Sequence, residues 1–361
     1  MDEATRRADF PITREWAYLD HATFGPFPTA AVAAMADVGR ALSEDVLGRS
    51  VGASALLESV RERAAGLLHC SSAHLALLRS TGEGVSLVAA GLDWQPGDEV
   101  IGYERDFPGT LAPWRHLADR GVVVRLVPAR ADHTFTCADV QRLLGPRTRV
   151  VCLSLVQFAS GFRAPIEEIA DLCRRHDVWL VVDAAQAVGS LRVDAAGLGA
   201  DIVAAHAYKF LLAGFGLAVC YCSPRAVETL RIPQVGERSA PGAARFEPSI
   251  PSLTNLAALG AALDVLLRIG PPTIEARIAA LTEMIASGLQ ARGWQVVSPR
   301  GAGQTSALVS AVHPDFDMEL VRHTLLEHHV ACAVRDGFLR LAPHVYTTPA
   351  DVEHLLAHLP R

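Results

Sequence analysis

The sequence contains one lysine, Lys209, although lysine and arginine together number 33. Both side chains carry a positive charge, but only the lysine amine loses its proton readily enough to condense with a carbonyl group. A chain that places arginine at every other basic position therefore marks Lys209 as a candidate for covalent chemistry. The alternative is an ordinary surface lysine.

An aspartate is expected close to this lysine. The apolar run VWLVVDAAQ reaches Asp183, and the apolar run DIVAAHAYK reaches Lys209. Ligands of open α/β sheets bind outside the carboxyl ends of the strands, so the carboxylate and the amine should converge on one crevice. Pyridoxal 5'-phosphate (PLP) needs such a pair, because lysine forms a Schiff base with it and an acid keeps its pyridine nitrogen protonated. A structural salt bridge between Asp183 and Lys209 is the alternative.

A third segment could bind the phosphate of such a cofactor. The residues Ser80-Thr81-Gly82-Glu83-Gly84 stand between an apolar run and a helical pattern. Backbone N–H groups at the start of a helix can face an anion, which makes Thr81 and Gly82 candidate contacts. A glycine-rich turn without a ligand would have the same pattern.

The elements that must position these residues alternate along the chain. Short apolar runs, typical of strands covered on both faces, alternate with helical periodicity between residues 55 and 270. This alternation predicts an α/β fold with a mostly parallel sheet sandwiched by helices. The predicted strands are HLALLRS, DEVIGYE, VVVRLVP, RVVCLSLV, VWLVVDAA, DIVAAHA and LAVCYC.

The C-terminal part predicts a second, smaller unit. Two longer helical patterns are followed by segments that indicate a β-α-β-β-α arrangement, namely TSALVSAV, DMELVRHTLLEHH, VACAV, FLRLAP and TPADVEHLLAHL. We therefore predict an N-terminal arm over 1–20 and a large cofactor-binding domain over 21–255. An interdomain helix and a small C-terminal α+β domain are predicted over 256–361.

Composition favours a small-molecule enzyme over other classes. The net charge is -6 and the arginines are scattered rather than gathered in one stripe, so no nucleic-acid partner is expected. The N-terminus is polar and no apolar run approaches the ~20 residues of a membrane helix, which predicts a cytoplasmic protein without a membrane partner. Seven cysteines form no C-x-x-C pair. They predict buried free thiols and no metal site.

The stretch VVDAAQAVGSLRVDAAGLGADIVAAHAYKFLLAGFG resembles the Asp-x-x-Gln segment and the lysine of fold-type I PLP enzymes. The resemblance is to the class V aminotransferase and cysteine desulfurase superfamily and spans nearly the whole chain. YKFLLAGFG and VQFASGF resemble its kynureninase and isopenicillin N epimerase-like branches. The resemblance implies PLP as the cofactor, with Asp183 at the pyridine nitrogen, Gln186 at the ring hydroxyl and Lys209 as the Schiff-base residue.

The same resemblance implies further cofactor contacts. His206 and Tyr208 match positions that hold phosphate-contacting side chains in relatives, with His206 in place of a common serine. Phe107, in YERDFPGTLAPW, resembles the kynureninase-type phenylalanine that stacks on the cofactor. Ser154 and Gln157, in CLSLVQFASGF, would line the opposite side of the ring.

Substrate contacts are implied at both ends of the chain. VRDGFLRLAPHVYTTPADV resembles the C-terminal family segment whose arginine holds the substrate carboxylate, which makes Arg340 the candidate. Arg335 is interpreted as a solvated charge at a strand end. YLDHATFGPFP resembles the N-terminal segment that closes over the substrate and offers His21. The family also implies a homodimer that acts on an amino acid.

The reaction depends on which bond breaks after the Cα proton leaves. We expect an aminotransferase, with a β-lyase acting on a C–S or C–C bond, or an amino-acid epimerase, as alternatives. A cysteine desulfurase needs a nucleophilic cysteine on a mobile loop, whereas Cys332 lies in the strand-like segment HHVACAVRDG, so this activity ranks lower. A binding protein without catalysis is a further alternative.

Overall fold

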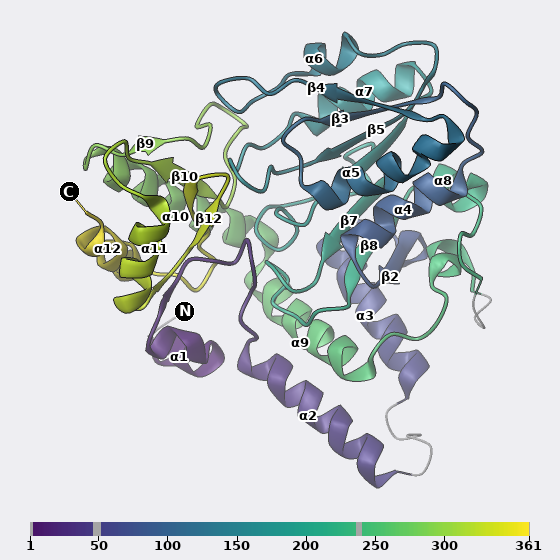
Figure 1. Ribbon diagram of the computed structural model, residues 1–361. Helices are drawn as coiled ribbons and strands as arrows, with labels where there is room; N and C mark the ends of the chain where they lie inside the picture. The colour runs from purple at the N-terminus through teal and green to yellow at the C-terminus, as the bar shows by residue number, and fades with distance from the viewer. Residues whose placement is uncertain (1–2, 46–51, 236–239, 361) are drawn as a thin grey trace.

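The computed structural model describes residues 3–45, 52–235 and 240–360 of the 361-residue chain (Figure 1). Its helices are α1 (Glu3–Asp9), α2 (Thr29–Glu44), α3 (Ala53–Leu67), α4 (Thr81–Gly91), α5 (Pro108–Arg115), α6 (Cys137–Gln141), α7 (Ile166–Arg175), α8 (Pro224–Thr229), α9 (Leu253–Ile269), α10 (Pro271–Gln290), α11 (Met318–Glu327) and α12 (Pro349–His358). Its short 3-10 helices are η1 (Pro11–Arg14), η3 (Ser72–His74), η4 (His116–Arg120) and η5 (Gly242–Phe246).

The strands form one large sheet and smaller ones. The strands of the large sheet are β2 (Leu75–Leu78), β3 (Glu99–Tyr103), β4 (Val123–Val127), β5 (Thr148–Ser154), β6 (Trp179–Asp183), β7 (Ile202–His206) and β8 (Ala218–Cys222). The others are β1 (Ala17–Tyr18), β9 (Gln295–Val296), β10 (Val309–Val312), β11 (Val330–Ala331), β12 (Ala333–Arg335) and β13 (Phe338–Leu341).

The large sheet has the strand order β2-β8-β7-β6-β5-β3-β4. From β7 to β4 all neighbours pair in parallel, whereas β8 pairs antiparallel with both β2 and β7. Every residue of β6 and β8 is buried, as expected for strands covered on both faces. Each apolar run proposed from the sequence forms one of these strands, so the predicted fold class is confirmed.

Alternate residues of each strand enter two different cores. On β6, Leu180 and Val182 pack into the core shared with α3, α7 and α9. Trp179 and Val181 face the core that contains residues of α4, α5 and α8. Figure 1 shows α4 and α5 on one side of the sheet. Because helices cover both faces, a ligand can approach this sheet only at the ends of its strands.

The small unit is a four-stranded antiparallel sheet, β12-β13-β10-β9, packed against α10, α11 and α12. The predicted β-α-β-β-α arrangement is present with two differences. The run VACAV forms two short strands, β11 and β12, and β9 is added at the sheet edge. Two-residue strands such as β9 are too short to show alternation in a sequence.

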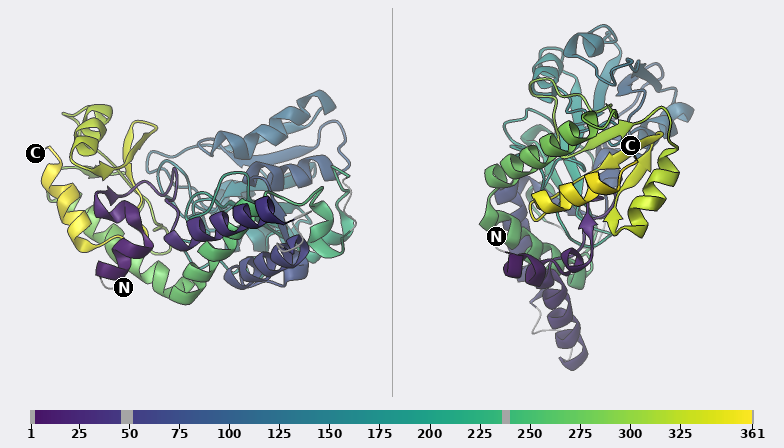
Figure 2. Two further views of the ribbon diagram at one scale, coloured as in Figure 1. Left: turned by 90° about the horizontal axis from the view of Figure 1, so that it is seen from below. Right: turned by 90° about the vertical axis from the view of Figure 1, so that its left-hand side faces the viewer.

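The N-terminal arm packs on the small unit, as Figure 2 shows. Strand β1 pairs in parallel with β11, and Asp20 forms a bridge with Ala342 just after β13. Helix α10 joins the two units, because Ile274 and Ile278 lie in the large core whereas Leu281 and Ile285 lie in the small one. The exact domain boundaries at residues 20 and 255 stay predictions.

In the described part of the chain, no helix by itself is long and apolar enough to cross a membrane. Of the described helices, α9 and α10 meet that length and composition only when taken together, and a bend of 79° separates them.

A buried ion pair fixes β2, the strand that leads to the predicted phosphate segment. Arg61 on α3 donates through Nη2 to Glu247 Oε2 at 3.0 Å and through Nη1 to the Leu75 carbonyl at 2.8 Å. Glu247 also accepts from the backbone N–H of Leu77 at 2.7 Å. Both charged side chains are almost fully buried. The pair therefore joins α3, β2 and the segment before α9.

Arg61→Ala should lower the free energy of unfolding by about 3 kcal/mol, because it leaves the Glu247 carboxylate buried without its counter-charge. Urea denaturation followed by circular dichroism measures the change. Arg63→Ala is the matched control on the same helix, since Arg63 pairs with Asp264 at the surface, and it should cost no more than about 0.5 kcal/mol. Equal effects of the two substitutions would contradict the expectation.

Candidate active site

Two neighbouring strands bring the predicted amine and carboxylate together. β6 ends at Asp183, and β7 beside it ends at His206, three residues before Lys209. Only 7% of Asp183 and 9% of Lys209 is exposed. Each charge shifts the pKa of the other, so the two groups interact across the crevice at the carboxyl ends of the strands. Lys209 is therefore not an ordinary surface lysine.

Burial makes the Lys209 amine easier to deprotonate. Desolvation lowers its pKa from 10.5 to about 8, the Asp183 carboxylate opposes this change, and the charges of Arg340 and Arg335 reinforce it. A neutral amine is the nucleophilic form that attacks carbonyl groups. The site thus gives its lysine a much larger neutral fraction near neutral pH than an exposed lysine has.

Asp183 is held in place by neighbouring donors. Its Oδ1 accepts from the backbone N–H of Ala185 at 2.9 Å, and its Oδ2 accepts from the Thr110 hydroxyl at 3.0 Å. Burial raises the pKa of Asp183, while the Ala185 N–H, the Lys209 amine and the Thr110 hydroxyl oppose that shift. Thr110 is a contact that the sequence analysis missed, because nothing in its local pattern connects it with Asp183.

The predicted phosphate segment forms the start of α4. Ser80 caps this helix by accepting from the N–H of Glu83, and Thr81 N–H donates to His206 Nδ1 at 3.4 Å. A Cβ atom on Gly82 would meet no atom closer than 3.8 Å, so the backbone there is open to approach. Burial lowers the pKa of His206 to about 4, with Lys209 contributing. A neutral His206 can donate one hydrogen bond to an anion.

Tyr208 and Phe107 place aromatic rings around the amine. Lys209 Nζ lies 5.7 Å from the ring centroid of Phe107 and 5.8 Å from that of Tyr208. Phe107 is 41% exposed, unusual for a large apolar side chain, and meets Phe158 edge to face at 5.5 Å between centroids. An open aromatic face beside the lysine fits the predicted stacking on a flat ring.

Asp106 organises three of the predicted cofactor contacts and was missed by the sequence analysis. Its carboxylate accepts from the backbone N–H of Phe107 at 2.8 Å and of Ser154 at 2.9 Å, from the Ser154 hydroxyl, and from Gln157 Nε2 at 3.4 Å. Burial raises the pKa of Asp106 to about 6, and Asp183 adds to this. Its position directly before Phe107 in the sequence was the only available signal.

Arg340 faces the site from β13, with 2% of its surface exposed. It donates to the Phe158 carbonyl at 2.8 Å and to the Thr23 hydroxyl at 2.7 Å, and it pairs with Asp20 at 3.5 Å. Arg335 donates to the same Thr23 hydroxyl at 3.2 Å and lowers the pKa of Lys209. The interpretation of Arg335 as a solvated charge is therefore wrong, because the hairpin of β12 and β13 turns it toward the site.

His21 is fully buried and uses both ring nitrogens within the protein. Nδ1 lies 2.8 Å from the Ala342 carbonyl, and Nε2 lies 2.6 Å from the Tyr346 hydroxyl. This geometry does not support the predicted substrate contact. The histidine instead joins the N-terminal segment to the end of β13, a role that depends on a partner more than 300 residues away.

Three buried polar atoms provide a test of whether a polar cofactor fits. Thr81 Oγ1, Gln157 Oε1 and Gln186 Oε1 are buried and have no hydrogen-bond partner among the residues that the structure describes, whereas Gln186 Nε2 donates to the Ala22 carbonyl at 3.1 Å. All three belong to the residues predicted to contact PLP. Unpaired polar atoms are costly in a protein interior, so the set fits a cofactor with phosphate and hydroxyl groups.

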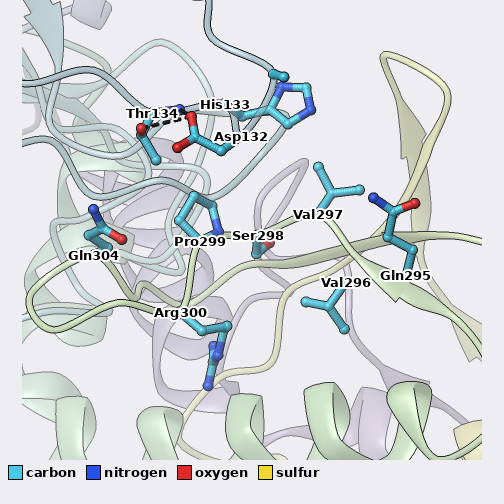
Figure 3. Close-up of a pocket in the computed structure, with 11 residues that line it drawn as sticks. Asp132, His133, Thr134, Gln295, Val296, Val297, Ser298, Pro299, Arg300 and Gln304 are labelled. Carbon is cyan, nitrogen blue, oxygen red and sulfur yellow. Dashed lines mark hydrogen bonds between the residues drawn. The ribbon is translucent and has the colours of Figure 1, made fainter.

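Hollows lie both beside and apart from this set, and Gln157 itself lines a small one. One of about 460 Å³ lies between the loop 131–134 and the segment 295–300, with Gln304 beside it (Figure 3). None of its lining residues belongs to the predicted site. Among the described residues, no group of three or more histidine, cysteine, aspartate or glutamate side chains is arranged to hold a metal ion.

The family Aminotransferase class-V matches residues 17–355. The chain belongs to this family. A probable cysteine desulfurase of Pseudomonas aeruginosa is 30% identical over 98% of this chain and 97% of its own length. One of Methanothermobacter thermautotrophicus is 29% identical over 77% of this chain and 73% of its own length. The predicted membership of the class V PLP superfamily is confirmed, and with it PLP as the cofactor.

Solved structures agree with this membership. A C-DES variant described as having glycine covalently linked to its PLP cofactor has a TM-score of 0.91 and 25% identity, covering 97% of this chain and 98% of its own. The cystine C-S lyase C-DES in complex with its reaction product cysteine persulfide has a TM-score of 0.90 and 25% identity, covering 96% and 98%.

These names correct the predicted reaction. The aminotransferase prediction is wrong, because the relatives and neighbours are named for cleavage of a C–S bond. Ranking cysteine desulfurase below the aminotransferase is corrected as well. The error has a physical cause, since a lysine, an aspartate and an arginine serve every reaction that begins at Cα. The homodimer and the cytoplasmic location stay predictions.

Lys209 should capture PLP at a rate that rises about tenfold per pH unit below its pKa of about 8 and levels off above it, because only the neutral amine attacks. Borohydride quenching and mass spectrometry of the cofactor-free chain would measure the attachment. Lys209→Arg should remove the attachment at this position, since a guanidinium does not condense. A capture rate that does not change with pH would contradict the expected pKa.

Proposed function

We propose that this protein is a PLP-dependent C–S β-lyase that acts on a sulfur-containing amino acid of the cysteine or cystine class. The observation that carries the proposal is the buried amine of Lys209 facing Asp183 and Arg340, in a chain that buries five of its seven thiols. The relatives named cysteine desulfurase and the neighbour named cystine C-S lyase support the choice of a sulfur substrate.

Different residues around Lys209 would contact different parts of the cofactor. When bound, PLP supplies an aldehyde for the amino group and a ring that withdraws electrons from Cα. Asp183 would face its pyridine nitrogen and Gln186 its ring hydroxyl, with Phe107 over the ring. Thr81, Gly82, His206 and Tyr208 would hold the phosphate end, and Ser154 and Gln157 would lie on the opposite side of the ring.

Arg340 would bind the substrate α-carboxylate. Its guanidinium is held by Phe158, Thr23 and Asp20, and its Nε is buried with no hydrogen-bond partner in the described part of the chain. Burial lowers the pKa of Arg340 to about 10, so it remains charged at neutral pH. A charged, oriented guanidinium makes strong charge-assisted bonds to a carboxylate.

Lys209 would move the proton in the bond-breaking step. A neutral amine takes the proton from Cα, the Cβ–S bond breaks, and its electron pair leaves with sulfur, which is then protonated. The remaining three-carbon fragment takes up water and is released as pyruvate and ammonia. With L-cystine, one water and one substrate thus give pyruvate, ammonia and cysteine persulfide. No external oxidant or reductant is required.

The relatives' names also favour a second candidate, a cysteine desulfurase that transfers sulfur to its own thiol and releases alanine. The cysteines of this chain weigh against it. Five of the seven are buried, including Cys332, whose pKa burial raises to about 12. The two less buried ones are no better, since burial raises the pKa of Cys70 to about 11 and raises that of Cys137. In the proposed reaction, sulfur therefore leaves with the electron pair of the Cβ–S bond and is not transferred to a protein thiol.

Product analysis of the PLP-loaded protein tests the proposal. Incubation with L-cystine or L-cysteine should give pyruvate and ammonia in equal amounts together with sulfane sulfur or sulfide. Alanine as the main product would instead indicate a desulfurase, and a keto acid formed only with an amino-group acceptor would indicate transamination. Absence of any sulfur release from either substrate would overturn the proposal.

Two substitutions separate the lysine from the thiols. Lys209→Ala should lower kcat by about 10³-fold, because it removes the amine that is proposed to take the Cα proton. Cys332→Ser is the control and should keep kcat within about twofold, since a buried thiol of high pKa does not act as a nucleophile. A large loss of activity in Cys332→Ser would favour the desulfurase.

A further inference from the structure

The backbone on either side of Lys209 is held by opposite ends of the chain. The carbonyl of Tyr208, directly before the lysine, accepts from the N–H of Gly25 at 2.8 Å. The carbonyl of Phe210, directly after it, lies 3.0 Å from His344 Nε2. Gly25 belongs to the N-terminal segment, and His344 follows β13 of the small unit. The backbone around the lysine is thus hydrogen-bonded to two segments that are remote in sequence.

The contacts of His344 fix which of its nitrogens carries hydrogen. The backbone N–H of Val345 donates to Nδ1 at 2.7 Å, so Nδ1 is an acceptor and the proton resides on Nε2. Nε2–H then donates to the Phe210 carbonyl. His344 is fully buried, and this burial lowers its pKa to about 4, which keeps the ring neutral at physiological pH. The hydrogen bond to Phe210 therefore has a fixed direction and does not switch near neutral pH.

On the side of Tyr208, Gly25 makes a close contact with the backbone of the lysine loop. A Cβ atom on Gly25 would lie 2.0 Å from the Lys209 carbonyl oxygen, far inside any permitted distance. The loop that follows is strained, because Leu212 has φ +56°, a left-handed conformation that is uncommon for leucine. A strained loop persists only where its surroundings hold it. Gly25 and His344 are two such constraints.

The segment that contains Gly25 and the segment that contains His344 also contact each other. His21, four residues before Gly25, lies with its ring 5.0 Å from that of His344 and binds both Ala342 and Tyr346. Arg6 donates to the Tyr346 carbonyl at 2.8 Å. The N-terminal segment and the segment after β13 thus form one packed block beside the lysine loop.

We propose that His344 is a positioning residue for Lys209. It holds the Phe210 carbonyl on one side of the lysine, while the Gly25 N–H holds the Tyr208 carbonyl on the other side. The small unit thereby sets the direction of the lysine amine. No atom of His344 needs to touch substrate or cofactor for this role. The role rests on the proposed function only in that the positioned amine is the group that takes the Cα proton.

The unique lysine allows a direct test on the full-length chain without added PLP. Reductive methylation with 13C-formaldehyde labels Lys209 and the α-amine, and Lys209→Arg assigns the two NMR signals. His344→Ala should raise the pKa of Lys209 by about one unit, because the freed loop lets the amine reach water. His344→Gln should restore the original pKa, since its amide can still donate to Phe210. Gly25→Ala should act in the same direction as His344→Ala.

Kinetics of the PLP-loaded variants give a second readout. His344→Ala should lower kcat about tenfold or more with little change in KM, because the proton-transferring amine is displaced while Arg340 is kept. His354→Ala is the control, an exposed histidine on α12 whose ring contacts the His328 carbonyl and the His358 ring, and it should change neither value.

The outcomes separate the two proposals. A Lys209 pKa that is the same in the wild type, His344→Ala and Gly25→Ala would overturn the positioning role, whatever reaction the enzyme catalyses. If His344→Ala does not fold, His344→Gln and Gly25→Ala decide, and equal pKa values in these two would overturn it. A wild-type enzyme that releases no sulfur would overturn the proposed function and leave the pKa comparison intact.

Discussion

The structure depends on keeping one amine and one carboxylate out of water and close together. Burial disfavours both charged forms, and the attraction between Lys209 and Asp183 opposes that cost for each of them. The balance leaves the amine less basic than an ordinary lysine, which is the condition for nucleophilic and proton-transfer chemistry near neutral pH. Helices on both faces of the sheet make this burial possible, because they leave only the strand ends open.

Around that pair, most polar side chains orient other site residues through hydrogen bonds and do not themselves react. Asp106 aligns Phe107, Ser154 and Gln157, and Thr110 orients Asp183. On the other side, Thr23 accepts from both site arginines. Apart from the bond between the neighbours Asp106 and Phe107, these contacts join segments that are distant in sequence, so the site exists only when the large unit, the small unit and the N-terminal arm are packed together.

The reaction class follows from what surrounds the lysine and not from the lysine itself. The same amine, acid and arginine can begin transamination, epimerisation or β-elimination, and among these the names of the relatives favour cleavage of a C–S bond. The burial of the cysteines then favours one C–S cleaving reaction over the other. Thiols that are buried and hard to deprotonate cannot accept sulfur readily, which favours elimination with the sulfur keeping its electron pair.

The sequence alone determined the parts that depend on local pattern. The apolar runs placed the strands of the large sheet, and the solitary lysine with the Asp-x-x-Gln segment indicated the cofactor, because strand periodicity and residue chemistry are local properties. Only the tertiary structure decided the rest. It turned Arg335 inward, enclosed His21 in hydrogen bonds, and placed Asp106, Thr110 and His344 beside residues that lie far away in the chain. Such contacts arise from packing between segments, and no spacing within one segment can encode them.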